Sequence, residues 1–401
     1  MPDRRLPAAF VTFGWCRSAY TVCRALSARG VAVHVGDSSR LAMTRFSRWC
    51  ESYTRLPDFF LSPQQYLEEV ICAMKEKGAT VLLPCSEDIE IFIRHSDQLP
   101  DEIMIAAPAL HNWQIAEDKF RYLEPVRSAG CAVPDTRVVG SEKNLLPLAE
   151  EIGFPLVLKV RNGNGSRGVA IIKNSSELHR KFDQFISEYD LPQNRWPVLQ
   201  RRIVGPKYQM DGVFVNGRSA HDGVYRILRA KGSGHFGTST YRQTVERPDI
   251  QESAAQALRA LNWHGIYNLD FICDDSGLPY LIDINGRLGG AVSILYEAGL
   301  DLPWIWYQLA LENEDFDEML ARSGVATKWL LGELLAFVEH LGKVDLRGGL
   351  KVFFGKGPRA QAFDDFSLRD PLPFIFELLD YSLKFMKSGG SLRPTVKGMV
   401  R

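Results

Sequence analysis

The chain has 401 residues, of which 45% are hydrophobic, and this is enough to bury more than one core. Lys plus Arg and Asp plus Glu number 48 each, so no overall charge favours nucleic acid as a partner. The seven cysteines form no Cys-x-x-Cys pair and no apolar run is long enough to span a bilayer, so we expect a cytoplasmic protein without disulfides, zinc or membrane association.

The first elements predict a β-α-β unit. Residues 8–13 are typical of a buried strand, 16–29 of a helix and 31–35 of a second strand. A helix at 63–77, a strand at 80–84, a helix from Glu87 and a strand at 103–107 continue the alternation, which predicts a Rossmann-like domain over residues 1–110. Its first turn carries only Gly14 where a dinucleotide fingerprint needs three glycines, so we reject a nicotinamide site.

Residues 111–195 predict a small α/β section. A helix is expected at 113–129, and it includes Lys119. Strands at 156–161 and 169–173 flank a glycine-rich loop that contains Gly163, Gly165, Ser166 and Gly168. Because a strand and not a helix follows this loop, we expect it at the tip of a hairpin, as a flap whose backbone N–H groups approach phosphates. Lys159, on the strand before the flap, can reach the same phosphates, although a plain flexible hairpin remains an alternative.

Residues 196–315 are expected to form a second, larger section dominated by strands, with one helix at 251–262. It begins with a strand that turns into a polar connector over residues 197–205. The backbone of such a connector can pair with the edge of an adenine base. An ordinary linker between domains is the alternative.

Two carboxylates mark the end of this section. Strands at 266–272 and 280–284, joined by a tight turn at 275–277, predict a hairpin that sets Asp270 beside Asp283, with Asn285 projecting the same way. Carboxylate and amide oxygens suit Mg²⁺ and leave places for phosphate. Arg287 adds a planar cation to the same rim. The alternative is an Asp-Asn-Gly turn with a surface arginine.

Residues 225–242 are basic and glycine-rich, which favours a loop that binds an anionic substrate. Arg226, Lys231 and His235 are its candidate catalytic residues, although a solvated hairpin is the alternative. In the C-terminal extension, residues 316–401, helical stretches flank a strand at 350–354 and no functional motif is recognisable.

Taken in order, Lys119, Lys159, the glycine loop, the connector, Asp270 and the segment from Asp283 to Arg287 resemble the ATP-grasp superfamily. The resemblance covers about residues 8–300 and is greatest to carbamoyl-phosphate-synthase-like, ATP-dependent carboxylate-amine ligases. It implies an α/β protein: a Rossmann-like domain, then an ATP-grasp fold whose two α+β lobes clasp ATP, then a C-terminal α/β extension that completes the large lobe.

The resemblance also implies roles for individual residues. Lys119 and Lys159 would hold the phosphates of ATP, and Gly163, Gly165, Ser166 and Gly168 would cover them. Gln200, Arg201 and Ile203 would face adenine, and Asp270, Asp283 and Asn285 would bind one or two Mg²⁺, or Mn²⁺. Arg287 would stabilise an oxyanion.

Three positions depart from the pattern of that family. Lys207 stands where a glutamate usually binds ribose, which leaves Gln209 as a substitute. Asp283 replaces a longer glutamate, and Gly286 replaces a proline. None of these changes removes the ligands for the cation.

The reaction that the resemblance implies is phosphorylation of a carboxylate by ATP and attack of an amine on the acyl phosphate. The substrates would be small molecules, amino acids or their derivatives, and a homodimer is compatible with the resemblance. A kinase or a carboxylating enzyme on the same scaffold is the first alternative. A non-catalytic nucleotide-binding subunit, which Lys207 favours, is the second.

Overall fold

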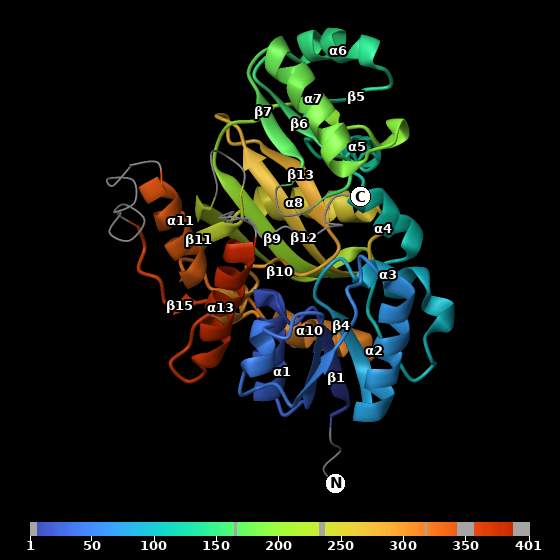
Figure 1. The fold of residues 1–401 in the computed structure, drawn as a ribbon, viewed down its shortest axis with the longest axis vertical. Helices are drawn as coiled ribbons and strands as arrows, with labels where there is room; N and C mark the ends of the chain where they lie inside the picture. Colours follow the sequence, from blue (N-terminus) through green and yellow to red (C-terminus); the bar gives the residue numbers. More distant parts are fainter. Residues whose placement is uncertain (1–5, 164–166, 232–236, 317–318, 343–356, 388–401) are drawn as a thin grey trace.

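The structure, a computed structural model, describes residues 6–163, 167–231, 237–316, 319–342 and 357–387. Within these ranges the strands form three sheets. Figure 1 shows a four-stranded sheet at the bottom, a second four-stranded sheet at the top and a seven-stranded sheet between them. The fold is mixed α/β, as the sequence predicts.

The N-terminal sheet is parallel and contains the predicted β-α-β unit. Its strands lie in the order β3-β2-β1-β4, and β1 pairs in parallel with β2 and β4. The strands are β1 (Ala8–Thr12), β2 (Val33–Asp37), β3 (Ser52–Arg55) and β4 (Ala79–Pro84). The helices are α1 (Arg17–Ala28), α2 (Pro63–Lys77) and α3 (Ile89–Arg94).

The strand expected at 103–107 is reduced to a single parallel bridge between Met104 and Val81. Two backbone hydrogen bonds, Met104 N to Thr80 O and Leu82 N to Met104 O, hold it there. Two residues later the carbonyl of Ala106 accepts a hydrogen bond from the indole of Trp306, at 3.1 Å. This distant side chain takes the acceptor that a neighbouring strand would use.

The second sheet forms the small section and carries the glycine loop. Its order is β5-β8-β6-β7, with antiparallel pairs throughout. The loop joins β6 to its antiparallel neighbour β7, so the predicted hairpin is confirmed. The elements are β5 (Thr136–Val138), α6 (Leu145–Ile152), β6 (Leu156–Lys159), β7 (Val169–Ile172), α7 (Ser175–Tyr189) and β8 (Val198–Arg201), and Figure 1 shows both helices on one side of the sheet.

The prediction of one continuous helix at 113–129 is wrong, and the difference affects the position of Lys119. Two helices, α4 (Leu110–Glu117) and α5 (Leu123–Ser128), stand in its place. Between them the Asp118 carboxylate accepts hydrogen bonds from Nη2 and Nε of Arg161, at 2.6 and 3.1 Å. The backbone N–H of Lys119 donates to the carbonyl of Arg161 at 3.0 Å. These bonds to a distant residue replace helical ones, and Lys119 lies in the connection between the helices.

The large sheet has the order β13-β12-β9-β10-β11-β14-β15. Its strands are β9 (Lys207–Val215), β10 (Arg218–Ala230), β11 (Ser239–Thr244), β12 (Gly265–Cys273), β13 (Pro279–Asn285), β14 (Ala326–Lys328) and β15 (Ala362–Phe363). Helix α8 (Pro248–Ala260) packs against β10 and β13. The C-terminal part thus adds two strands to the edge of this sheet, whereas the strand expected at 350–354 lies outside the described residues.

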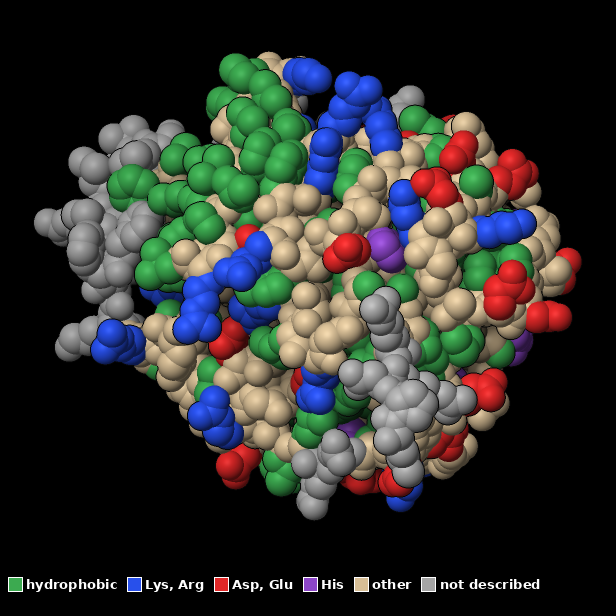
Figure 2. Space-filling view, turned by 90° about the horizontal axis from the view of Figure 1, so that it is seen from below, with side chains coloured by type: hydrophobic (Ala, Val, Ile, Leu, Met, Phe, Trp, Pro, Cys, Tyr) green, Lys and Arg blue, Asp and Glu red, His purple; other side chains and the backbone are tan. Residues whose placement is uncertain are grey.

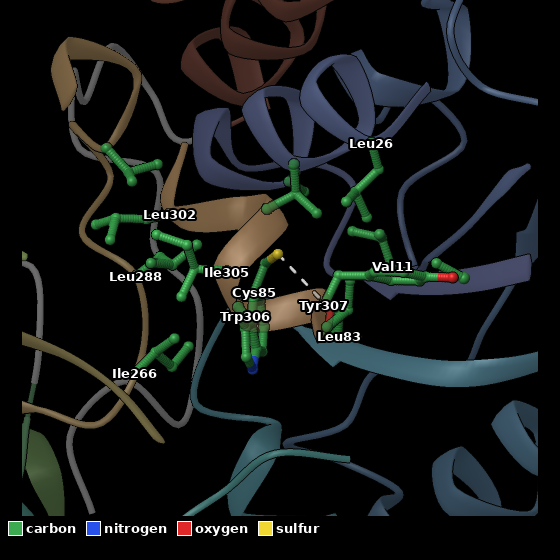
Figure 3. Close-up of a cluster of buried hydrophobic side chains, with 14 of the residues drawn as sticks. Val11, Leu26, Leu83, Cys85, Ile266, Leu288, Leu302, Ile305, Trp306 and Tyr307 are labelled. Atoms are coloured by element: carbon green, nitrogen blue, oxygen red, sulfur yellow. Dashed lines mark hydrogen bonds between the residues drawn. The ribbon is translucent and has the colours of Figure 1, made fainter. Parts of the chain in front are cut away.

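Two helices join the large sheet to the N-terminal one. They are α9 (Ser293–Glu297) and α10 (Leu302–Ala310). Figure 3 shows Ile305, Trp306 and Tyr307 of α10 among buried side chains that also include Val11 and Leu83 of the N-terminal sheet. This shared apolar core fixes the N-terminal sheet against the large sheet.

The C-terminal helices complete the described fold. They are α11 (Leu330–Gly342) and α13 (Leu372–Lys387), and short 3-10 helices occupy Met43–Phe46, Ser96–Gln98, Glu142–Asn144 and Gln193–Arg195. Figure 2 shows acidic and basic side chains spread over one face of the molecule, with hydrophobic side chains gathered toward one side of it. Among the described residues no helix is both long and apolar enough to cross a bilayer.

Three buried carboxylates give the fold a testable pH dependence. Burial raises the pKa of Asp37, Asp88 and Asp211 to about 6 from an ordinary value of 3.8. A carboxyl with a raised pKa in the folded state adds stability below its unfolded pKa, and this stability is lost as pH rises through 6. We therefore expect the melting temperature to rise as pH falls from about 7 toward about 5.

Scanning calorimetry at several pH values measures this dependence. Asp88→Asn should make the slope shallower, because it removes one of the three carboxyl groups whose pKa is raised by burial. A melting temperature that falls steadily from pH 7 to pH 5 would contradict the raised pKa values.

Candidate active site

A cavity of about 310 Å³ is lined by residues of the small and the large sheet and of the segments that follow β1 and β4 of the N-terminal sheet. It runs from β8 of the small section, across β12 and β13, to the loops that follow β1 and β4. Most of the residues singled out in the sequence line it. They are Lys119, Lys159, Gly163, Gln200, Arg201, Ile203, Lys207, Gln209, Asp270, Asp283, Asn285 and Arg287.

The floor of the cavity carries a row of oxygen-bearing side chains on adjacent antiparallel strands. Asp270 of β12 lies opposite Asp283 of β13 on one side and opposite Gln209 of β9 on the other. Asn285 follows Asp283 by two residues on β13 and lies opposite Asn268 of β12. Its Nδ2 donates a hydrogen bond to Oδ1 of Asn268 at 3.2 Å. The predicted hairpin and the shared face of its carboxylates are confirmed.

A β-bulge interrupts the hairpin within this row. The register shifts after Asp270, so that Phe271 pairs with Leu281 and Ile282 is the extra residue. The carbonyl of Ile282 accepts a hydrogen bond from Nζ of Lys159, at 2.6 Å. The bulge thus anchors the lysine of β6 beside the carboxylates, an arrangement that alternation alone does not predict.

Lys119 approaches the row from the other side. Its Nζ lies 3.1 Å from Oδ1 of Asp283 and donates to the carbonyl of Gly163 at 2.8 Å. The residue is only 5% exposed. One ammonium group therefore ties the first glycine of the flap to a carboxylate of β13.

The charges in the cavity shift one another. Burial, with the neighbouring Asp283, raises the pKa of Asp270 to about 6. Burial lowers the pKa of Lys159 to about 8, although Asp283 opposes this shift. Burial also acts to lower the pKa of Lys119, but Asp283 and Glu117 outweigh it and the pKa is raised. The two lysines thus differ: Lys119 holds the ion pair, and Lys159 contacts a neutral carbonyl.

Arg287 is fixed by a residue of the N-terminal sheet. Its Nε donates to Oε1 of Glu87 at 2.7 Å, and its Nη1 donates to the carbonyl of Leu288 at 3.2 Å. Ser86 donates to the other oxygen of Glu87 at 2.7 Å. Burial acts to raise the pKa of Glu87, but the guanidinium outweighs it and holds the pKa at about 2. The loop after β4 therefore sets the position of Arg287.

The connector after β8 forms the opposite end of the cavity. Gln200 is buried and donates to the hydroxyl of Thr136 at 3.0 Å, while Arg201 is exposed and its guanidinium lies over the ring of Tyr280. Lys207 lines the cavity at the start of β9, and burial lowers its pKa, which Asp270 opposes. Gln209 donates to Asp270 at 2.6 Å, so its amide is already engaged by a carboxylate.

At two positions the structure explains why a glycine is present. Gly168 has φ +61°, and a Cβ there would lie 2.5 Å from the side chain of Val160. A Cβ at Gly286 would lie 2.2 Å from Trp113, so a proline at this position would clash with that indole. The departure at Gly286 therefore compensates for a bulky neighbour.

Not every candidate reaches the cavity. Arg226 is exposed on β10, and its neighbours Tyr225 and Ile227 face the other way. The ammonium of Lys231 lies over the rings of Trp329 and Tyr381, at 5.1 and 5.5 Å. Neither residue is among those that line the cavity. His235, Gly165 and Ser166 lie outside the described residues.

The structure adds polar residues that the sequence analysis did not single out. Asn268 lines the cavity two residues before Asp270, where alternation along the strand could have revealed it. Glu87 follows β4, and the carboxyl ends of parallel strands are a common place for ligands. Arg17, at the start of α1, also lines the cavity, and no local pattern marks it.

The donor set fits a hard divalent cation. Two carboxylates and an amide oxygen face one another, the ligand type that Mg²⁺ prefers. Oδ1 of Asp283 is a buried atom with no hydrogen bond among the described residues, and the ammonium of Lys119 lies 3.1 Å from it. Among the described residues no group of three or more His, Cys, Asp or Glu side chains could hold a metal, and the third oxygen-bearing side chain of this row is an asparagine.

Comparison with known proteins shows what the chain is similar to. Residues 198–332 match a family model described as ATP-grasp in the biosynthetic pathway with Ter operon. Over 191 residues the chain is 26% identical to the carbamoyl phosphate synthase large chain of Vibrio cholerae, which covers 46% of this chain. The chain spans only 17% of the length of that relative.

Solved structures share the fold over most of the chain. An L-amino acid ligase from Bacillus licheniformis aligns with a TM-score of 0.64 and 16% identity, covering 81% of this chain and 80% of that one. The biotin carboxylase domain dimer of 2-oxoglutarate carboxylase from Hydrogenobacter thermophilus was solved with MgADP and bicarbonate. It aligns with a TM-score of 0.62 and 19% identity, covering 79% of this chain and 71% of that one. With the sheets described above, these matches show that the chain shares the ATP-grasp fold, and residues 198–332 match an ATP-grasp family model.

Proposed function

We propose that this protein is an ATP-dependent ligase that activates a carboxylate as an acyl phosphate and joins it to an amine. One observation carries the proposal. A single cavity holds two lysines, the row of Asp270 and Asp283, and Arg287 fixed by the N-terminal sheet. Such a cavity combines charges for a triphosphate at its centre with space for a second substrate beside it.

The lysines and the carboxylates would position the phosphates. Lys119 and Lys159 would neutralise phosphate oxygens, and the glycine loop after Gly163 would cover them. Asp270, Asp283 and Asn285 would hold magnesium, which would offset the charge of the phosphates. The connector residues Gln200, Arg201 and Ile203 would lie beside adenine. Lys207 and Gln209 would lie near the ribose.

The second substrate would bind at the end of the cavity formed by the N-terminal sheet. The loops after β1 and β4 line this end, at the carboxyl edge of a parallel sheet. The carboxylate would attack the γ-phosphorus and release ADP. The amine nitrogen would then attack the acyl carbon. The bond between this carbon and the bridging oxygen would break, so that phosphate leaves with that oxygen, and the amine nitrogen would lose a proton. Arg287 would stabilise the oxyanion between these steps.

Amino acids or their derivatives are the proposed substrates. The ligase from Bacillus licheniformis, which shares the fold, is named as acting on L-amino acids. Arg287 and Glu87 place opposite charges at the same end of the cavity, which suits a molecule with both a carboxylate and an amino group.

Hydroxylamine provides a direct test, because it can replace an unknown amine and converts an acyl phosphate into a hydroxamate, which forms a coloured complex with Fe³⁺. The protein would be incubated with ATP, Mg²⁺ and pools of amino acids and other small carboxylates. We expect ADP, inorganic phosphate and hydroxamate to form only with particular carboxylates. Mass spectrometry of parallel reactions with amine pools would then identify the amide.

The same assay separates the other candidate functions. A kinase would form ADP and a phosphorylated product without amine-dependent release of phosphate. A carboxylating enzyme would depend on bicarbonate. MgATP binding without turnover across the whole panel would indicate a non-catalytic subunit, and each of these outcomes would overturn the ligase proposal.

A further inference from the structure

Lys119 makes two contacts that a bound metal and nucleotide would contest. Its Nζ lies 3.1 Å from Oδ1 of Asp283, the oxygen that the proposed cation would take. The same Nζ donates to the carbonyl of Gly163 at 2.8 Å, at the start of the loop that would cover the phosphates. A buried ammonium thus occupies the place of the cation and holds the first residue of the loop.

We propose that Lys119 is the counter-ion of the nucleotide-free site and changes partner when a metal–nucleotide complex binds. In the free protein it neutralises Asp283 and opposes binding of a bare divalent cation. When the complex arrives, the cation takes over Asp283, and Lys119 moves from Asp283 and Gly163 to a phosphate oxygen. The inference rests on the proposed function, because it assumes that Asp283 is a metal ligand.

The other lysine of the cavity cannot serve in this way. Nζ of Lys159 is held at 2.6 Å on the carbonyl of Ile282, a neutral group that the β-bulge presents. Lys119, by contrast, lies between helices α4 and α5, outside regular structure. Its backbone is anchored on Arg161, so its side chain can change partner without a change in the helices.

The charges explain why the exchange would be cooperative. A cation alone would meet a carboxylate that is already paired and would leave a buried ammonium unpaired, which is costly. A nucleotide alone would attract Lys119 but would bring its phosphates close to two free carboxylates. Together they supply a new partner for each group, so each should bind more tightly when the other is present.

Manganese reports binding without any turnover. The hexaaqua Mn²⁺ signal in electron paramagnetic resonance falls as the ion binds, so the free ion can be titrated against the protein alone or with a non-hydrolysable ATP analogue. For the natural protein we expect weak binding of Mn²⁺ alone and much tighter binding with the analogue. In Lys119→Met, Mn²⁺ alone should bind about tenfold tighter, because the competing charge is gone.

Lys159→Met is the matched control, since it removes the same charge from the same cavity. We expect it to tighten bare Mn²⁺ binding by less than about threefold, because Lys159 contacts a carbonyl and not a carboxylate. If the affinity for Mn²⁺ alone rose equally in both variants, the effect would come from the loss of any positive charge in the cavity, and the proposal would be overturned. Unchanged Mn²⁺ affinity in Lys119→Met would overturn it as well.

Three further variants keep the test decisive. Lys119→Gln provides a second neutral side chain should the methionine variant fail to fold, and Lys119→Arg, which keeps the charge, should bind bare Mn²⁺ as weakly as the natural protein. Asp283→Ala separates this proposal from the proposed function. If it leaves binding of Mn²⁺ with the analogue intact, the metal assignment itself fails. If it abolishes that binding while Lys119→Met changes nothing, only the exchange of partners is wrong.

Discussion

Replacing Asp283 with alanine is expected to abolish substrate-dependent ADP release while the fold stays intact. The loss should exceed about a thousandfold in kcat/KM, because a magnesium ligand and the charge that fixes Lys119 are removed together. The side chain of Asp283 is 19% exposed and lies at the cavity, outside the apolar cores, and Lys119 keeps its hydrogen bond to the carbonyl of Gly163, so the melting temperature should change by only a few degrees. A coupled assay for ADP with the identified substrates measures the effect.

Asp275→Ala is the matched control for this loss. Asp275 lies in the exposed turn of the same hairpin and is not among the residues that line the cavity, so its removal should leave turnover unchanged. Full activity of Asp283→Ala would refute the metal assignment. A large drop in melting temperature would instead show that the carboxylate supports the fold.

The acidic hairpin could be predicted from the sequence, but its bulge could not. Two runs with alternating character and a tight turn fix which residues share a face, and Asp270 does lie opposite Asp283. The extra residue at Ile282 leaves no mark in that pattern, because an apolar residue fits either register. Yet the bulge frees the carbonyl that holds Lys159, and so the geometry of the lysine had to come from the structure.

Contacts between distant segments account for the other differences. Residues 113–129 have a helical pattern, but Arg161 binds Asp118 from 43 positions away and the helix ends at Glu117. Glu87 reaches Arg287 across 200 positions, which no local signal indicates. For Arg226, by contrast, a local signal was available. Alternation along β10 puts Arg226 on the opposite face from Tyr225, and this alternation would have excluded Arg226 from the candidate catalytic residues.

One buried ion-pair network links the C-terminal part to the cavity. Asp364, directly after β15, is fully buried and accepts from Nη1 of Arg17 at 2.6 Å. It is also paired with Arg242, which is fully buried, and its other oxygen accepts from the hydroxyl of Ser293 at 2.6 Å. Burial, with the nearby Arg17, lowers the pKa of Arg242 to about 9. One carboxylate therefore compensates two buried guanidinium groups from α1 and β11.

Removing that carboxylate should be among the most destabilising single changes in the chain. In Asp364→Ala, Arg17 and Arg242 would lose the buried carboxylate that both contact, and we expect the free energy of unfolding to fall by about 3–5 kcal/mol. Urea denaturation followed by tryptophan fluorescence measures this fall. Glu124→Gln is the matched control, because Glu124 and Arg127 form an exposed pair on α5 whose loss should cost less than about 1 kcal/mol. A similar small loss for Asp364→Ala would mean that the two arginines find other partners, and that the C-terminal part does not depend on this network for its attachment to α1.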